Sequence, residues 1–65
     1  MKATDLIIGQ KYIWRRNSQT THEAVYIGTD DPYNYIMYVF EYEKEGNKYY
    51  TYLSVHHLKN DIYEN

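Results

Sequence analysis

The chain has 65 residues and a formal net charge of -2, with 25% charged and 43% hydrophobic residues. This length predicts a single domain over residues 1–65, and the composition is that of a globular chain rather than a disordered one. The absence of cysteine excludes disulfides, thiolate metal sites and a cysteine nucleophile. The sequence has neither an apolar run of about 18 residues nor a signal peptide pattern, so we expect a cytoplasmic protein with no membrane contact.

Tyrosine is unusually frequent, with ten copies, and it brings the aromatic content to 18%. A core this small cannot bury ten tyrosines, because each buried hydroxyl needs a hydrogen-bond partner. Some of these rings must therefore be exposed. Two explanations stay open at this stage. AT-rich codon usage enriches tyrosine together with Lys, Asn and Ile, and contact surfaces are also enriched in tyrosine.

The order of local signals predicts an all-β chain, because β-branched and aromatic runs alternate with turn residues. After a lead-in that ends at Gly9, the predicted strands cover residues 11–16, 22–28, 35–45, 48–53 and 62–63. Polar loops are expected at 17–21 and 29–34, where Pro32 and Asx residues supply turn chemistry. Ser54 is a suitable N-cap for a single 3₁₀ turn over 55–58, which Asn60 and Asp61 are expected to end.

The strongest local signal is Gly46-Asn47, which predicts a two-residue hairpin loop of type II′. This loop sets Glu45 opposite Lys48 and Phe40 opposite Leu53. Because side chains alternate along a strand, the hairpin then has two distinct faces. The apolar face carries Tyr38, Phe40, Tyr42, Tyr49, Thr51, Leu53 and Val55, and the other carries Glu41, Glu43, Glu45, Lys48, Tyr50 and Tyr52. The two strands agree on which side is apolar, which supports the register.

Two segments carry a resemblance to a known fold. The opening Leu6-x-x-Gly9-x-x-Tyr12-x-Trp14 resembles the first strand of many small bacterial and phage SH3-like proteins. Residues 53–58, Leu-Ser-Val-His-His-Leu, are similar to the 3₁₀ turn that precedes the last strand of that fold. The resemblance covers residues 6–63 and implies a single small five-stranded SH3-like barrel. The chain lacks the Ala-Leu-Tyr-Asp-Tyr run of signalling SH3 domains, so binding of Pro-rich peptides is not implied.

Candidate catalytic and metal-binding residues lack the spacing that their chemistry needs. The adjacent His56 and His57 point in different directions on a helix or strand, so we expect one on the barrel edge and one in solvent. Asp30, Asp31 and Asn34 lack the alternating oxygens, central Gly and terminal Glu of a calcium loop. No nucleophile motif or Gly-rich phosphate loop is present. We therefore predict a protein that is not an enzyme and has no cofactor and no metal.

The predicted binding surface is the outer face of the hairpin at residues 35–53. Its residues are Tyr35, Met37, Val39, Glu41, Glu43, Lys48, Tyr50 and Tyr52. An apolar patch with a charged rim indicates a contact site, here for another protein or a second copy of the chain. The opposing interpretation is that strand twist places Met37 or Val39 in the core. The small size and acidity also suit a phage or mobile-element protein that inhibits a host protein.

Nucleic-acid binding is the alternative function. The first strand combines aromatic and basic residues at Tyr12, Trp14, Arg15 and Arg16, and single-strand binders use stacking plus phosphate contacts. The negative net charge and the scattered basic residues count against this interpretation.

Two further interpretations stay open. Glu41, Glu43 and Glu45 at alternate strand positions have a spacing similar to that of phosphates, which would suit a nucleic-acid mimic. A small-molecule site between subunits of an oligomer is the other.

Overall fold

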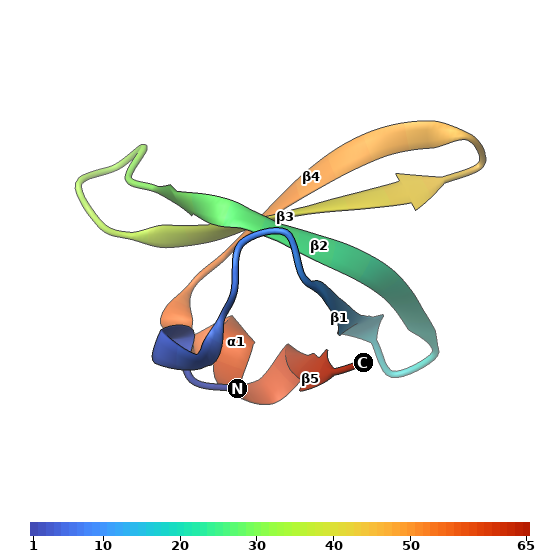
Figure 1. Cartoon of the computed structure of the whole chain (residues 1–65), viewed down its shortest axis with the longest axis horizontal. Helices are drawn as coiled ribbons and strands as arrows, with labels where there is room; N and C mark the ends of the chain where they lie inside the picture. Colours follow the sequence, from blue (N-terminus) through green and yellow to red (C-terminus); the bar gives the residue numbers. More distant parts are fainter.

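Five antiparallel strands form one sheet in the order β4-β3-β2-β1-β5 (Figure 1). The computed structural model describes all residues from Met1 to Asn65. The strands are β1 (Lys11–Asn17), β2 (Thr20–Asp30), β3 (Met37–Lys44), β4 (Asn47–Leu53) and β5 (Ile62–Glu64). A 3₁₀-helix, η1 (Ala3–Asp5), precedes them, and an α-helix, α1 (Val55–Asp61), lies between β4 and β5. The predicted all-β class is confirmed. Because β4 and β5 each pair with one neighbour only, the sheet is not closed.

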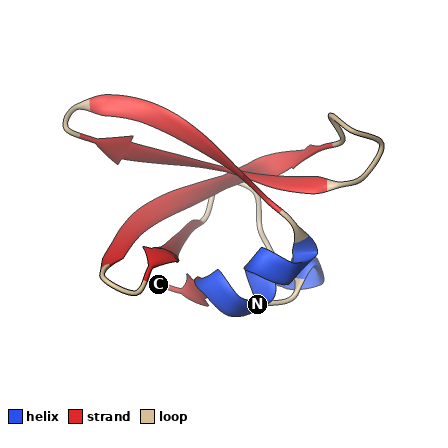
Figure 2. Ribbon diagram, turned by 180° about the vertical axis from the view of Figure 1, so that it is seen from behind, coloured by secondary structure: helices blue, strands red, loops and turns tan.

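The sheet is strongly twisted, so its two ends lie on different sides of the long strands. Figure 2 shows the helical segments and both chain ends grouped on one side of the sheet. The β2–β3 loop and the β3–β4 turn project at opposite ends of the molecule, as Figure 1 also shows. Most residues of the predicted binding surface lie on β3 and β4, between these two projections.

The core lies on the sheet face that α1 covers. Its eight buried residues are Tyr12, Trp14, Ala24, Tyr26, Phe40, Leu53, Leu58 and Ile62. Strand alternation places the seven strand residues on one face, as the pairs Tyr12–Ala24, Tyr26–Phe40 and Trp14–Ile62 show, and α1 contributes Leu58. The Tyr12 hydroxyl accepts a hydrogen bond of 2.9 Å from the Ile7 backbone N–H, which satisfies this buried polar group.

The β3–β4 turn lies one residue earlier than predicted. Its two central residues are Glu45 and Gly46, with φ of 54° and 80°, and two positive φ values define a type I′ turn. Glu43 therefore lies opposite Lys48 rather than Tyr50, and the predicted register is wrong by two residues. An even shift keeps every side chain on its predicted face. Glu45 is in the turn, so the predicted row of three glutamates along one strand does not form.

The segment after β4 is longer than the single 3₁₀ turn predicted for residues 55–58. It is the α-helix α1, of seven residues. Ser54 caps it as predicted, because its Oγ accepts from the His57 backbone N–H at 3.4 Å. Asn60 was expected to end the turn. Its side-chain amide instead donates to the His56 carbonyl oxygen at 3.3 Å, one helical turn back, and the helix continues through it.

Candidate protein-binding surface

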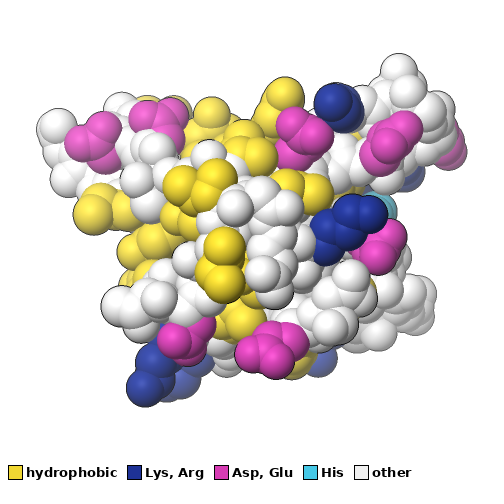
Figure 3. Space-filling view, in the orientation of Figure 1, with side chains coloured by type: hydrophobic (Ala, Val, Ile, Leu, Met, Phe, Trp, Pro, Cys, Tyr) yellow, Lys and Arg dark blue, Asp and Glu magenta, His cyan; other side chains and the backbone are white.

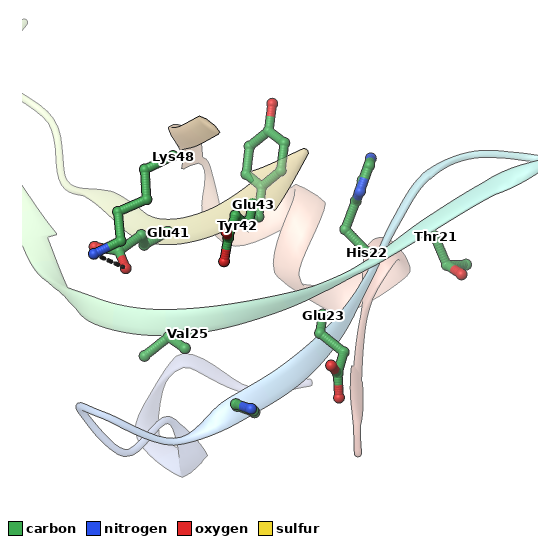
Figure 4. A pocket seen from close by; sticks show the side chains of 9 residues that line it. Thr21, His22, Glu23, Val25, Glu41, Tyr42, Glu43 and Lys48 are labelled. Carbon is green, nitrogen blue, oxygen red and sulfur yellow. Dashed lines mark ion pairs between the residues drawn. The ribbon is translucent and has the colours of Figure 1, made fainter. Parts of the chain in front are cut away.

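The face of β3 and β4 that points away from the core is here called the hairpin face. It consists of Met37, Val39, Glu41 and Glu43 from β3 and Lys48, Tyr50 and Tyr52 from β4. One half is charged. There the Lys48 ammonium lies 3.6 Å from the Glu41 carboxylate, an ion pair drawn as a dashed line in Figure 4. The other half is apolar and adjoins the β2–β3 loop.

A pocket of about 350 Å³ lies where the β2–β3 loop meets the apolar half of the hairpin face. It is here called the tyrosine pocket and is lined by Asp30, Pro32, Tyr33, Tyr35, Met37 and Tyr52. The Tyr33 and Tyr35 ring centroids are 6.3 Å apart, with 34° between the ring planes. Three tyrosine rings from the loop and from β4 therefore surround one concave site.

A β-bulge in β2 decides which side chains reach this pocket. The β2–β3 register shifts between Tyr26 and Gly28, so one extra residue is accommodated in β2. Beyond the bulge Gly28 lies opposite Val39, and Asp30 lies opposite Met37. In a regular strand, Asp30 would share the face of Tyr26 and point toward the core. The bulge therefore brings the Asp30 carboxylate to the outer side, where it lines the pocket.

Five exposed apolar residues lie in or beside the tyrosine pocket. They are Tyr33 at 74%, Ile36 at 59%, Tyr35 at 57%, Tyr50 at 55% and Tyr52 at 48%, whereas Ile7, Ile8 and Val55 are exposed elsewhere on the chain. In Figure 3, hydrophobic side chains lie in patches at the left and upper middle of the face in view, with Asp and Glu side chains next to them. An exposed apolar area with a polar rim is typical of an interaction site.

The predicted contact residues divide into exposed and buried ones. Tyr35, Tyr50 and Tyr52 are exposed, and Met37 is half-buried. Val39 is only 7% exposed, which corrects its assignment as a contact residue, although it lies outside the main core cluster.

Sequence reasoning did not single out two exposed residues beside this surface, Tyr33 and Ile36, because one falls in a predicted loop and the other at a predicted strand end. An apolar or aromatic residue inside an otherwise polar loop is the signal that could have identified them.

The residues of the alternative nucleic-acid surface do not form one exposed surface. Tyr12 is 1% exposed and Trp14 is 8% exposed, so their rings are buried in the core and inaccessible to bases. Arg15 and Arg16 are exposed, and the Arg15 guanidinium lies 3.8 Å from the Asp61 carboxylate. Tyr12 and Trp14 alternate with Lys11 and Arg15 along β1, so the two rings and these two charges lie on opposite faces of the strand.

A second concave region, of about 380 Å³, lies beside the charged half of the hairpin face (Figure 4). Its lining residues are Lys11, Thr21, His22, Glu23, Val25, Glu41, Tyr42, Glu43 and Lys48. In Figure 4, His22 and Tyr42 point to the opposite side of the strands from Glu23 and Val25. The chain has no cluster of three or more His, Asp or Glu side chains that could hold a metal ion. The region carries both basic and acidic side chains, and two of them, Lys48 and Glu41, form an ion pair.

His22 is held among aromatic rings on the core side of the sheet. Its ring centroid is 5.5 Å from that of Trp14 and 4.9 Å from that of Tyr42. Its Nε2 is buried and has no hydrogen-bond partner. Burial, followed by the nearby charges of Arg16 and Lys44, lowers the pKa of His22 below its ordinary value of 6.5. The folded chain therefore favours the neutral imidazole.

Comparisons with protein-family models, curated proteins and solved structures give no match for this chain. Neither helix of the structure has the length and apolar character needed to cross a membrane. The function is therefore inferred from the hairpin face and the tyrosine pocket themselves.

Proposed function

We propose that the chain is a non-catalytic binding module that contacts another protein through the hairpin face and the tyrosine pocket. The observation that carries this proposal is the pocket of about 350 Å³ with three exposed tyrosines in its wall. Tyrosine is enriched in protein interfaces, where it supplies a large apolar area and a polar hydroxyl. Rings that fill no core position in the folded chain are available for a partner.

The tyrosine pocket supplies the anchors of the proposed interface, and the charged half of the hairpin face supplies its rim. Tyr35, Met37 and Tyr52 are the anchors, because they line the pocket. Glu41, Glu43 and Lys48 form a charged rim on the neighbouring half of the face. Rim charges mainly affect the rate and the selectivity of association, whereas central aromatic residues contribute most of the affinity.

We also propose that the fold is a small SH3-like barrel. The order of five short strands, with one helical segment directly before the last, supports this assignment. The antiparallel pairing of the first strand, β1, with the last strand, β5, also supports it. A small cytoplasmic module of this kind suits a phage or mobile-element inhibitor of a host protein, and its size and acidity support that role.

The test is capture of a partner from a host lysate by the tagged protein, with and without nuclease. The test variant is Tyr50→Ala with Tyr52→Ala. The matched control is Tyr49→Ala with Tyr63→Ala, which removes two tyrosines of similar exposure, 44% and 43%, outside the hairpin face. The proposal predicts a stoichiometric, nuclease-resistant band with the parent and the control, and its loss with the test variant.

Two other results would overturn the proposal. A band that both double variants retain would exclude the hairpin face as the contact. A band that nuclease removes would favour nucleic acid as the ligand. Circular dichroism of both variants verifies that each is folded before capture is compared.

A further inference from the structure

The tyrosine pocket combines aromatic rings with a carboxylate. Tyr33, Tyr35 and Tyr52 contribute rings, and Asp30 contributes the only charged side chain of the lining. The three rings expose 74%, 57% and 48% of their residue surface, which a ligand can cover. The pocket therefore offers both the ring surfaces and the negative charge that a cation needs.

No basic residue of the chain occupies this site. No Lys or Arg lies between Arg16 and Lys44 in the sequence. The same stretch holds five carboxylates, those of Glu23, Asp30, Asp31, Glu41 and Glu43. In Figure 3, the upper left end of the molecule, where Figure 1 places the β2–β3 loop, shows acidic and hydrophobic side chains without Lys or Arg.

The Asp30 carboxylate is positioned but has no ion pair. Its Oδ1 accepts a hydrogen bond of 2.9 Å from the Asp31 backbone N–H. The chain has two ion pairs, Arg15–Asp61 and Lys48–Glu41, and neither includes Asp30. The lysine that belongs to the hairpin face is therefore engaged at the charged half, away from the pocket lining.

Three classes of ligand group can be compared for such a site. An apolar group would take the Asp30 carboxylate out of water without replacing its hydrogen bonds, which is unfavourable. An anion would meet a carboxylate and no cation. An organic cation is attracted both by the carboxylate and by the negative faces of the tyrosine rings. The chemistry of the lining thus favours a cation over the other two classes.

We propose that the tyrosine pocket binds a cationic side chain of the protein partner, namely a lysine, a methylated lysine or an arginine. This inference rests on the proposed function, because the cationic side chain belongs to the protein partner proposed there. It adds the chemical group that the partner must supply and the pocket that receives it. The hairpin face then contacts the residues that flank this side chain in the partner.

The probes are acetylated and amidated derivatives of lysine, trimethyllysine and arginine. A neutral analogue, in which carbon replaces the trimethyllysine nitrogen, has the same shape without the charge. Binding is followed by NMR titration, with the ring signals of Tyr33, Tyr35 and Tyr52 as reporters. We expect at least one cationic derivative to shift these signals and to bind about tenfold more tightly than the neutral analogue.

Variants of the chain separate the pocket from general electrostatic attraction. Asp30→Asn removes the carboxylate of the pocket with little change in shape. Asp5→Asn removes the same charge at an exposed position in η1 and is the matched control. We expect Asp30→Asn and Tyr33→Leu each to weaken binding of the cationic derivative severalfold, and Asp5→Asn to leave it unchanged.

Three results would overturn the inference. They are equal affinity for the neutral analogue, equal effects of Asp30→Asn and Asp5→Asn, and the absence of ring shifts with every cationic derivative. These results are separable from a failure of the proposed function. Cation binding without partner capture would contradict the protein interface alone, whereas partner capture without cation binding would contradict this inference alone.

Discussion

Val39 and Tyr52 lie directly opposite each other in β3 and β4, yet Val39 is 7% exposed and Tyr52 is 48% exposed. Side chains in directly opposite positions of an antiparallel pair have Cβ atoms about 5 Å apart. One member of the pair is therefore a buried support, and the other is available to a partner. This division separates the residues that stabilise the hairpin face from those that we propose to bind.

Truncation of these two residues should affect stability and partner capture to different extents. Val39→Ala removes buried aliphatic groups and should lower the free energy of unfolding by about 2 kcal/mol. Tyr52→Ala should lower it by less than about 1 kcal/mol, because the ring is half exposed, but it should greatly weaken partner capture. Urea unfolding and capture by each folded variant check the two effects. A larger stability loss for Tyr52→Ala than for Val39→Ala would contradict the division.

The type I′ turn predicts opposite effects at its two central residues. Gly46 has φ of 80°, and a Cβ atom added to it would have no other atom within 4 Å, so Gly46→Ala carries a backbone cost without a clash. We expect a loss of about 1–2 kcal/mol, the cost of a left-handed L-residue. Glu45→Asn should stabilise the chain by up to about 1 kcal/mol, because Asn tolerates positive φ better than Glu does. Thermal unfolding measures both changes, and no effect of Glu45→Asn would contradict the turn assignment.

The N-cap of α1 should contribute measurably to stability. Ser54→Ala removes the side-chain acceptor of the His57 backbone N–H, and it should cost about 1 kcal/mol. Ser54→Asp keeps an acceptor at the same position and should retain most of that stability. Chemical denaturation of the three proteins measures the difference. Equal destabilisation by Ala and Asp would show that the cap hydrogen bond is not what Ser54 contributes.

Lowering the pH should destabilise the chain through His22. The folded state lowers the pKa of His22, whereas the unfolded chain has the ordinary value of 6.5. The unfolded state therefore binds more protons in the interval between these two pKa values, and the free energy of unfolding falls as the pH decreases through 6.5. His22→Phe keeps an aromatic ring without titration and should have a shallower dependence between about pH 8 and about pH 5. Parallel pH profiles for the two proteins would contradict the assignment to His22.

Alternation of side chains predicted the two faces of the hairpin, but not the register of the turn. Gly46 belongs to the two-residue loop in either register, and only the conformation of Glu45 distinguishes them. A glutamate with positive φ is not expected from turn preferences, so the sequence favoured Gly46-Asn47. The error of two residues left the faces intact, because faces depend only on whether the shift is even.

The composition of the tyrosine pocket could not be predicted for a different reason. It depends on the extra residue that β2 accommodates between Tyr26 and Gly28, which brings Asp30 to the outer side. In the sequence, turn residues follow Gly28, so the strand is expected to end there and Asp30 to lie in a loop. Tyr35 and Tyr52 were predicted from alternation alone, whereas the loop ring of Tyr33 required the backbone path of residues 31–36.

The most direct test of the hairpin face is site-specific photo-crosslinking in cells that express the chain. A photoreactive phenylalanine derivative replaces one tyrosine at a time, at positions 35, 50 and 52 in the surface and at 49 and 63 outside it. Similar side chains at similar exposure then differ only in location. We predict one shared crosslinked protein from the first three positions and none of it from the other two. Crosslinks to that protein from positions 49 and 63 but not from the hairpin face would contradict the proposed interface.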